Sequence, residues 1–146
     1  MTNIAVERAT PADLPAILAL LTGSGLPHDG LAEHIETALV ARAGSEVVGS
    51  VALELYGEAA LLRSVAVAEA LRGQGLGRKL TEAALQLARE HGVRRLYLLT
   101  TTAEGYFPHF GFMPIARSEV APAVQVSAEF TGACPDSAAV LALTLG

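Results

Sequence analysis

The chain has 146 residues, of which 51% are hydrophobic and 17% charged, a composition that predicts one packed domain and excludes a disordered chain. Its formal net charge of -5 and its pI of about 5.3 exclude a general nucleic-acid binder, which needs clustered Lys and Arg to displace counterions. No apolar run approaches the roughly 20 residues that cross a bilayer, so we expect a cytoplasmic protein without a membrane partner.

The first part of the chain predicts a strand followed by two helices. Residues 4–9 alternate as a short strand. The run from Thr10 to Asp13 supplies a cap, a proline and an acid, which favour a helix start, and apolar residues at helical spacing extend that helix to about Thr22. Residues 28–35 are expected to form a second short helix.

A change of hydrophobic period marks the beginning of the sheet. From Thr37 the period is two, which predicts antiparallel strands in residues 38–41 and 47–55. Gly57-Glu58 fits a two-residue hairpin turn with glycine first. Residues 61–68 are apolar enough for a central strand.

The remaining elements alternate between helix and strand. Residues 81–90 predict a helix with one apolar face, and residues 95–99 predict a buried strand. Residues 104–110 are expected to form a short helix and residues 138–145 a last strand, whereas residues 118–136 are weakly patterned. One α/β domain with a mixed sheet is the economical interpretation.

A glycine-rich turn from Arg72 to Gly77 lies between the central strand and the following helix. Successive backbone N–H groups in such a turn can point into one concavity at a helix N-terminus, which binds phosphate. Gly75 and Gly77 would let the backbone approach the anion, and Arg72 and Arg78 add positive charge. The alternative is a helix entry that only turns the chain. The Walker and dinucleotide patterns both fail, because no Gly-Lys-Ser/Thr follows and the third glycine would fall at Arg78.

Two motifs resemble the core of the GNAT N-acetyltransferase superfamily. The first motif consists of residues 62–67 followed by the pattern Arg72-x-x-Gly75-x-Gly77, and the second runs from Tyr106 to Phe112. The resemblance implies an α/β fold in one domain over residues 1–146, with a mixed, mostly antiparallel sheet of six to seven strands that splays at its centre and is flanked by helices. It also implies an acyltransferase that uses acetyl-CoA as its acetyl donor.

Three further stretches are similar to the branch of this superfamily associated with arsenic resistance. They are residues 61–64, 97–105 and 134–138. That branch is similar to N-acetylglutamate synthase acetyltransferase domains. A single cysteine, Cys134, supports arsenic binding poorly, because soft metals recruit several thiolates and a lone cysteine is commonly a small buried hydrophobe. The four histidines lack metal-ligand spacing, so no metal is expected.

The resemblance implies that the donor lies along the end of the central strand and the following turn. The pantetheine arm would pair with strand backbone in the central gap, and the diphosphate would bind the turn. The backbone N–H of Val65 or a neighbour would face the thioester carbonyl and stabilise the oxyanion. The implied cofactor-binding residues are Val65, Ala66, Val67, Arg72, Gly73, Gln74, Gly75, Leu76, Gly77, Arg78, Thr100, Thr102 and Phe107.

The general base remains open, and Glu54 is a candidate. If Gly57-Glu58 is the two-residue turn, Glu54 pairs with Leu61 and lies on the same face as Arg63, diagonal to it. A register slip of one residue would place Glu54 and Arg63 on opposite faces. The alternative is a solvated strand residue at Glu54.

The general acid also remains open. Many GNAT enzymes place a tyrosine acid four residues before the glycine of the Gly-Phe pair, where this chain has Phe107. Tyr106 precedes Phe107 and on a helix would point about 100° away from it. Either Tyr106 is reoriented, or a threonine or a water serves, or the thiolate leaves unassisted.

Arg63 and Ser64 are candidate substrate-binding residues. Arg63 lies in an otherwise apolar strand, and a buried guanidinium needs an anionic partner. That partner is either Glu54 or a carboxylate of the substrate, and the second option agrees with the resemblance to glutamate-acetylating domains.

The leading hypothesis is therefore acetylation of the amine of a small molecule, either an amino acid or an amino-acid-like organoarsenical toxin. The alternatives are acetylation of a protein or peptide amine and a non-catalytic CoA-binding regulatory module. The apolar final strand leaves room for a homodimer.

Overall fold

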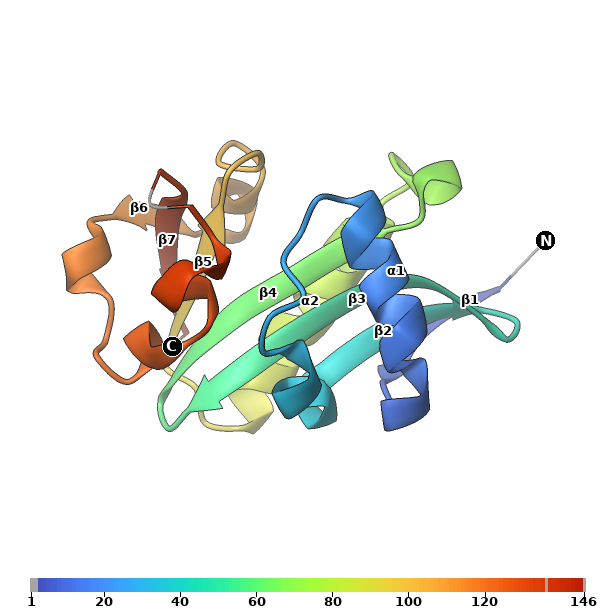
Figure 1. Cartoon of the computed structure of the whole chain (residues 1–146), viewed down its shortest axis with the longest axis horizontal. Coiled ribbons are helices and arrows are strands. Elements are labelled where there is room, and N and C mark those ends of the chain that lie inside the picture. Colours follow the sequence, from blue (N-terminus) through green and yellow to red (C-terminus); the bar gives the residue numbers. More distant parts are fainter. Residues whose placement is uncertain (1–2, 136, 146) are drawn as a thin grey trace.

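One mixed sheet, in the order β1-β2-β3-β4-β5-β7-β6, organises the described residues (Figure 1). The structure is a computed structural model that describes residues 3–135 and 137–145, so Met1, Thr2, Asp136 and Gly146 of the predicted domain lie outside it. Its strands are β1 (Ile4–Arg8), β2 (Ala38–Ala43), β3 (Glu46–Tyr56), β4 (Ala59–Val67), β5 (Arg95–Thr100), β6 (Met113–Ile115) and β7 (Ala139–Thr144). Only the β4–β5 pair is parallel among these strands, which confirms the predicted α/β fold with a mostly antiparallel sheet.

Helix α1 (Leu14–Gly23) covers one face of the sheet and begins close to the predicted cap (Figure 1). The Thr10 amide donates to Asp13 Oδ2 at 2.8 Å, and a short 3-10 turn, η1 (Pro11–Asp13), leads into the helix. Leu21 on α1 is fully buried in the apolar cluster that this helix forms with β2 and β3. The capping residues and the apolar spacing therefore act together, as the sequence predicted.

Helix α2 (Leu76–Glu90) covers the opposite face and packs mainly on β3 and β4. The predicted start at Thr81 was wrong, because the helix begins five residues earlier. Gly75 precedes the helix in a left-handed conformation with φ of 85°, which turns the chain sharply into the first helical turn. Leu80 and Ala84 are buried against the sheet, so the apolar face of the helix orients it.

The hairpin of β3 and β4 has the register predicted from the turn at Gly57-Glu58. Glu54 lies opposite Leu61, and Arg63 lies opposite Ala52. Glu54 and Arg63 therefore share one face of the sheet, as predicted.

The sheet opens between its two parallel strands. Pairing of β4 with β5 is confined to Ala59–Leu61 against Arg95–Tyr97. Beyond these residues the two strands diverge, and β5 turns away from β4 together with β7 (Figure 1). This confirms the predicted splay at the centre of the sheet, and the residues that follow on each strand form the walls of a cavity.

Two of the predicted helices are shorter and tighter than expected. The helix predicted over 28–35 is a 3-10 segment, η2 (Leu31–Thr37), with a kink at His34. The helix predicted over 104–110 is a 3-10 turn, η4 (Phe107–Phe110), preceded by a turn. The segment η2 lies in the connection from α1 to β2, and η4 lies in the connection from β5 to β6. Short i to i+3 turns are frequent in such connections and here take the place of full helices.

The weakly patterned region contains short turns that the sequence did not reveal. They are η5 (Arg117–Glu119), η6 (Val124–Val126) and a π-type turn, η7 (Glu129–Ala133). Strand β6 was not predicted, and it pairs with β7 at the edge of the sheet. Val120 and Val124 are buried and cover the outer part of the sheet, and η7 brings polar side chains to the central opening.

Candidate active site

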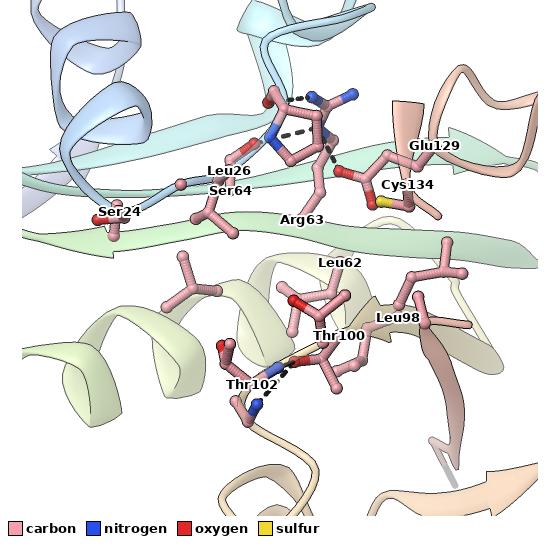
Figure 2. A pocket seen from close by; sticks show the side chains of 18 of the residues that line it. Ser24, Leu26, Leu62, Arg63, Ser64, Leu98, Thr100, Thr102, Glu129 and Cys134 are labelled. Atoms are coloured by element: carbon pink, nitrogen blue, oxygen red, sulfur yellow. Dashed lines mark hydrogen bonds and ion pairs between the residues drawn. The ribbon is translucent and has the colours of Figure 1, made fainter. Parts of the chain in front are cut away.

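A cavity of about 620 Å³ occupies the opening between β4 and β5. Its walls come from four parts of the chain that are far apart in sequence: the loop after α1, the end of β4, the end of β5 with the turn that follows, and η7. The lining residues are Gly23, Ser24, Gly25, Leu26, Pro27, Leu62, Arg63, Ser64, Val65, Ala66, Val67, Arg72, Leu98, Leu99, Thr100, Thr101, Thr102, Ala103, Tyr106, Phe107, Glu129, Ala133, Cys134, Pro135 and Ala138. Figure 2 shows Arg63, Glu129 and Cys134 on one side of β4, and Leu62, Leu98 and Thr100 on the other.

Strand β4 bends at Ser64, on the wall of this cavity. The pairing with β3 shifts by one residue, so that Ser64 and Val65 together lie opposite Val51. Ser64 has φ of 61°, which is unusual for a residue with a side chain, and its carbonyl accepts a hydrogen bond of 2.8 Å from the Ser50 hydroxyl. A bulge of this kind re-aims the backbone groups that follow it. It lies at the position where the resemblance expects the thioester carbonyl.

The glycine-rich turn leads from β4 into α2 beside the cavity. Gly73 and Gly75 have φ of 80° and 85°, and a Cβ added at either residue would meet no atom within 4 Å. Their outer surface is therefore open to a ligand. Arg72 links the turn to the cavity, because its Nε donates to the Val67 carbonyl at 3.1 Å and its Nη2 to Ser24 Oγ at 3.3 Å. The turn thus has the shape and charge of an anion site at a helix N-terminus.

Tyr106 and Phe107, the first two residues of the second motif, lie differently. Phe107 is 7% exposed and packs edge-on against Phe112 in the core. Tyr106 is 38% exposed, and its hydroxyl lies 3.6 Å from the position that a Cβ on Gly77 would take. Burial raises the pKa of the Tyr106 phenol above its usual value, so the hydroxyl is a donor at neutral pH. It faces the first turn of α2.

Thr100, at the end of β5, holds the turn that follows. Its hydroxyl accepts hydrogen bonds from the amides of Ala103 at 2.9 Å and Thr102 at 3.3 Å. These bonds fix the wall that faces β4 and occupy the hydroxyl oxygen as an acceptor.

Arg63 is the centre of a buried polar network behind the bend. Its Nη1 donates to Glu54 Oε2 at 2.7 Å and to the Asp29 carbonyl at 2.6 Å. Its Nη2 donates to the Pro27 carbonyl at 3.1 Å, and its Nε to Ser64 Oγ at 3.0 Å. These four hydrogen bonds leave little of the guanidinium for a ligand, since it has five N–H groups in all.

Glu54 is 1% exposed and does not line the cavity. It accepts a hydrogen bond of 2.5 Å from the Tyr56 hydroxyl in addition to the one from Arg63, and His34 Nε2 lies 3.7 Å from it. Burial alone would raise the pKa of this carboxyl, but the hydrogen bonds from Tyr56 and Arg63 outweigh burial and hold the pKa below its usual value. The geometry therefore disfavours Glu54 as the base, and makes it a partner of Arg63.

Glu129, on η7, is a second carboxylate on the same guanidinium. Its Oε2 lies 3.4 Å from Arg63 Nε, it is 4% exposed, and it lines the cavity. Burial raises the pKa of Glu129 to about 7, against the attraction of Arg63 and with the repulsion of Glu54. Sequence reasoning missed Glu129, because it lies in the weakly patterned segment, where no local pattern marks it.

Most of the predicted site residues meet at this cavity. Those that line it are Arg63, Ser64, Val65, Ala66, Val67, Arg72, Thr100, Thr102, Tyr106 and Phe107. Those that lie outside the lining are Glu54 and the residues of the turn and first helical turn, Gly73, Gln74, Gly75, Leu76, Gly77 and Arg78. Their catalytic and binding roles stay predictions.

The described part of the chain contains neither a cluster of metal ligands nor a helix that could span a membrane. No group of three or more His, Cys, Asp or Glu among residues 3–135 and 137–145 could hold a metal ion. Over the same residues, no helix has the length and apolar character that crossing a membrane requires.

The chain belongs to the acetyltransferase (GNAT) family, which residues 12–112 match, and it is an acyltransferase by this membership. It is 33% identical over 125 residues to the amino-acid acetyltransferase of Mycobacterium tuberculosis, a match that covers 79% of this chain and 71% of that protein. It is 34% identical over 90 residues to an uncharacterized N-acetyltransferase of Chlorobaculum tepidum, which covers 61% of this chain and 57% of that one.

Solved structures confirm the fold. The Mycobacterium tuberculosis protein Rv2747, in complex with CoA and NLQ, superposes with a TM-score of 0.80 at 24% identity, over 97% of this chain and 99% of that one. The N-acetylglutamate synthase of Neisseria gonorrhoeae, complexed with coenzyme A and N-acetyl-glutamate, gives a TM-score of 0.84 at 21% identity. The whole chain matches 36% of that protein. The arsenic-resistance branch does not appear among these relatives.

Proposed function

We propose that this protein is an acetyl-CoA-dependent N-acetyltransferase that transfers the acetyl group directly to the amine of a small molecule. The observation that supports this proposal best is the continuity of the site. The glycine-rich turn at the start of α2 and the cavity between β4 and β5 meet at Arg72, so one extended ligand can contact both. Acetyl-CoA has the matching chemistry, with a diphosphate at one end and a thioester at the other.

The residues on the donor side fit acetyl-CoA. The diphosphate binds the N–H groups of Gly73 to Gly77, and Arg72 adds positive charge beside it. The end of β4, from Val65 to Val67, lacks a paired neighbour on its β5 side and offers backbone groups to the pantetheine arm. The N–H of Val65, just after the bend, stabilises the negative charge that develops on the carbonyl oxygen.

Direct transfer is favoured over an acyl-enzyme. Cys134 is the single cysteine of the chain, and burial raises the pKa of its thiol to about 12. A thiol that stays protonated at neutral pH is a poor nucleophile. The amine of the acceptor is therefore the group that attacks the thioester.

An amino acid is the proposed class of acceptor. The relative of 33% identity is an amino-acid acetyltransferase, and the synthase of similar fold was solved with N-acetyl-glutamate. An amino-acid-like organoarsenical remains a narrower proposal that rests on the sequence resemblance alone. Arg63 and Ser64 line the cavity, but protein groups hold the guanidinium, so we assign Arg63 to the cavity wall and not to a free carboxylate clamp.

Acetylation of a protein amine is the second candidate. The mouse N-alpha-acetyltransferase 80 is 42% identical to this chain over 52 residues, which cover 17% of that protein. A cavity of about 620 Å³ has the size of a small-molecule site. This favours the small acceptor.

A panel of amino acids, amine-bearing organoarsenicals and peptides, each with acetyl-CoA, tests the proposal through release of free thiol. We expect turnover of at least one amino acid, and we expect peptides to be acetylated at least about tenfold more slowly than that amino acid. Tight CoA binding without acetylation of any acceptor would favour a regulatory CoA-binding module and overturn the proposal.

A further inference from the structure

Two buried carboxylates share one guanidinium beside the cavity, and only one of the two carboxylates faces the cavity. Glu54 and Glu129 both lie within ion-pair distance of Arg63, at 2.7 Å from Nη1 and 3.4 Å from Nε. We propose that Glu129 is the general base that takes the proton from the acceptor amine, and that the Arg63–Glu54 pair positions and tunes it. This inference rests on the proposed function and names a residue for its least defined step.

The geometry distinguishes the two carboxylates. Glu54 has short bonds to Arg63 and to the Tyr56 hydroxyl, and it is shielded from the cavity. Glu129 lies on the cavity wall, and its distance to Arg63 is 3.4 Å, compared with 2.7 Å for Glu54. A carboxylate oxygen of Glu129 is thus the one that an amine in the cavity can reach (Figure 2).

The charge balance of the network explains why Glu129 can exchange a proton. One guanidinium faces two carboxylates, so full ionisation would leave one negative charge in a buried site, which is costly. Among the described residues, the charged and titratable groups that act on Glu129 are Arg63 from β4, Glu54 from β3 and the Cys134 thiol. The Tyr56 hydroxyl donates to Glu54, and the Ser127 hydroxyl accepts a hydrogen bond from the Glu129 amide. Arg63 is the cation of this set, and of the two carboxylates Glu54 lies closer to it. The excess charge is relieved by protonation at Glu129, whose pKa of about 7 suits a base at neutral pH.

An incoming ammonium supplies the missing positive charge. Its nitrogen gives one proton to a Glu129 oxygen and becomes a neutral amine. The nitrogen lone pair then forms the bond to the thioester carbonyl carbon, and the carbon–sulfur bond breaks with its electron pair on sulfur. The second proton of the nitrogen passes to that sulfur, directly or through water, to give free thiol. Glu129 returns its proton to solvent, so each turnover yields one amide, one thiol and one proton.

The test compares Glu129→Gln with the matched variant Glu54→Gln, which changes the other carboxylate on the same guanidinium. The readout is kcat/KM for the acceptor as a function of pH, from pH 5 to pH 9, at saturating acetyl-CoA. The wild type should lose activity as the pH falls through about 7, since Glu129 then becomes protonated. Glu129→Gln should lower kcat/KM about 10²-fold or more and remove this acid limb, while CoA affinity stays within about twofold.

Glu54→Gln gives a second readout, which is the pH at which the acid limb of kcat/KM lies. Loss of a purely structural contact would not shift this limb. With Glu54 neutral, Arg63 pairs with Glu129 alone, so the pKa of Glu129 falls and the acid limb shifts to lower pH. If Glu129→Gln keeps the wild-type rate and pH profile, or Glu54→Gln leaves the limb in place, the inference is overturned. Should Glu129→Gln fail to fold, the position of the limb in Glu54→Gln decides alone. A wild type that acetylates no amine would overturn the proposed function and this inference together.

Discussion

Replacement of Gly75 by alanine tests the anion site at the start of α2, because the structure offers a matched control at the other end of the same helix. Gly75 precedes α2 with φ of 85°, and Gly92 follows it with φ of 76°. A Cβ at either position would meet no atom within 4 Å. The two variants therefore carry the same backbone penalty and no internal clash.

The expected loss of stability is the same for Gly75→Ala and Gly92→Ala. A residue with a side chain in the left-handed region costs about 1–2 kcal/mol, which corresponds to a fall in Tm of about 3–6 °C for a domain of this size. Binding of CoA should separate the variants. A methyl group at Gly75 projects into the space proposed for the diphosphate and removes one charge-assisted hydrogen bond of about 1.5–3 kcal/mol, so CoA affinity should fall about 10-fold to 100-fold.

Isothermal titration with CoA measures the two dissociation constants, and thermal unfolding without ligand checks the matched penalty. Gly92→Ala should bind CoA as the wild type does. If Gly75→Ala and Gly92→Ala bind CoA within about twofold of each other, the diphosphate does not bind this turn, and the glycines serve only to turn the chain.

Three other variants probe the network, the cap and the second motif. Arg63→Met should lower the free energy of unfolding, measured in urea, by about 3–5 kcal/mol, because it leaves Glu54 charged and buried. Adding Glu54→Gln should restore part of this loss. A loss below about 1 kcal/mol for Arg63→Met would contradict the network. Asp13→Asn should cost about 2 kcal/mol at pH 7, since hydrogen bonds from Arg42 and from the Thr10 amide hold the pKa of Asp13 at about 2, below its usual 3.8. This stabilisation is complete above about pH 4 and is lost as the pH falls through about 2, so a difference between variant and wild type that stays constant down to pH 2 would refute it. Tyr106→Phe should raise the KM for acetyl-CoA about fivefold, the value of one hydrogen bond, with little change in kcat; a selective loss of kcat would instead identify Tyr106 as the general acid.

Local chemistry explains the parts that the sequence predicted well. The register of the β3–β4 hairpin follows from the turn at Gly57-Glu58, so the pairing of Glu54 with Arg63 could be expected from a count of residues. The cap at Thr10 and the turn at Gly75 also depend on neighbouring residues alone. The beginning of α2 was missed because Gly77 lies in its first turn and weakens the helical pattern.

Long-range packing decided the rest of the site. Arg63 is held by the carbonyls of Pro27 and Asp29 and lies beside the carboxylate of Glu129, so little of it is free for a substrate. These three groups come from segments distant from Arg63 in sequence. No local pattern marks Glu129 as functional, since its raised pKa arises from burial and from Glu54 on β3, against the attraction of Arg63 on β4. The sequence by itself determined the family, the turn that identifies the proposed donor site and the shared face of Glu54 and Arg63. Only the tertiary structure brought η7 to the opening between β4 and β5, because burial and charge sharing exist only once distant segments meet.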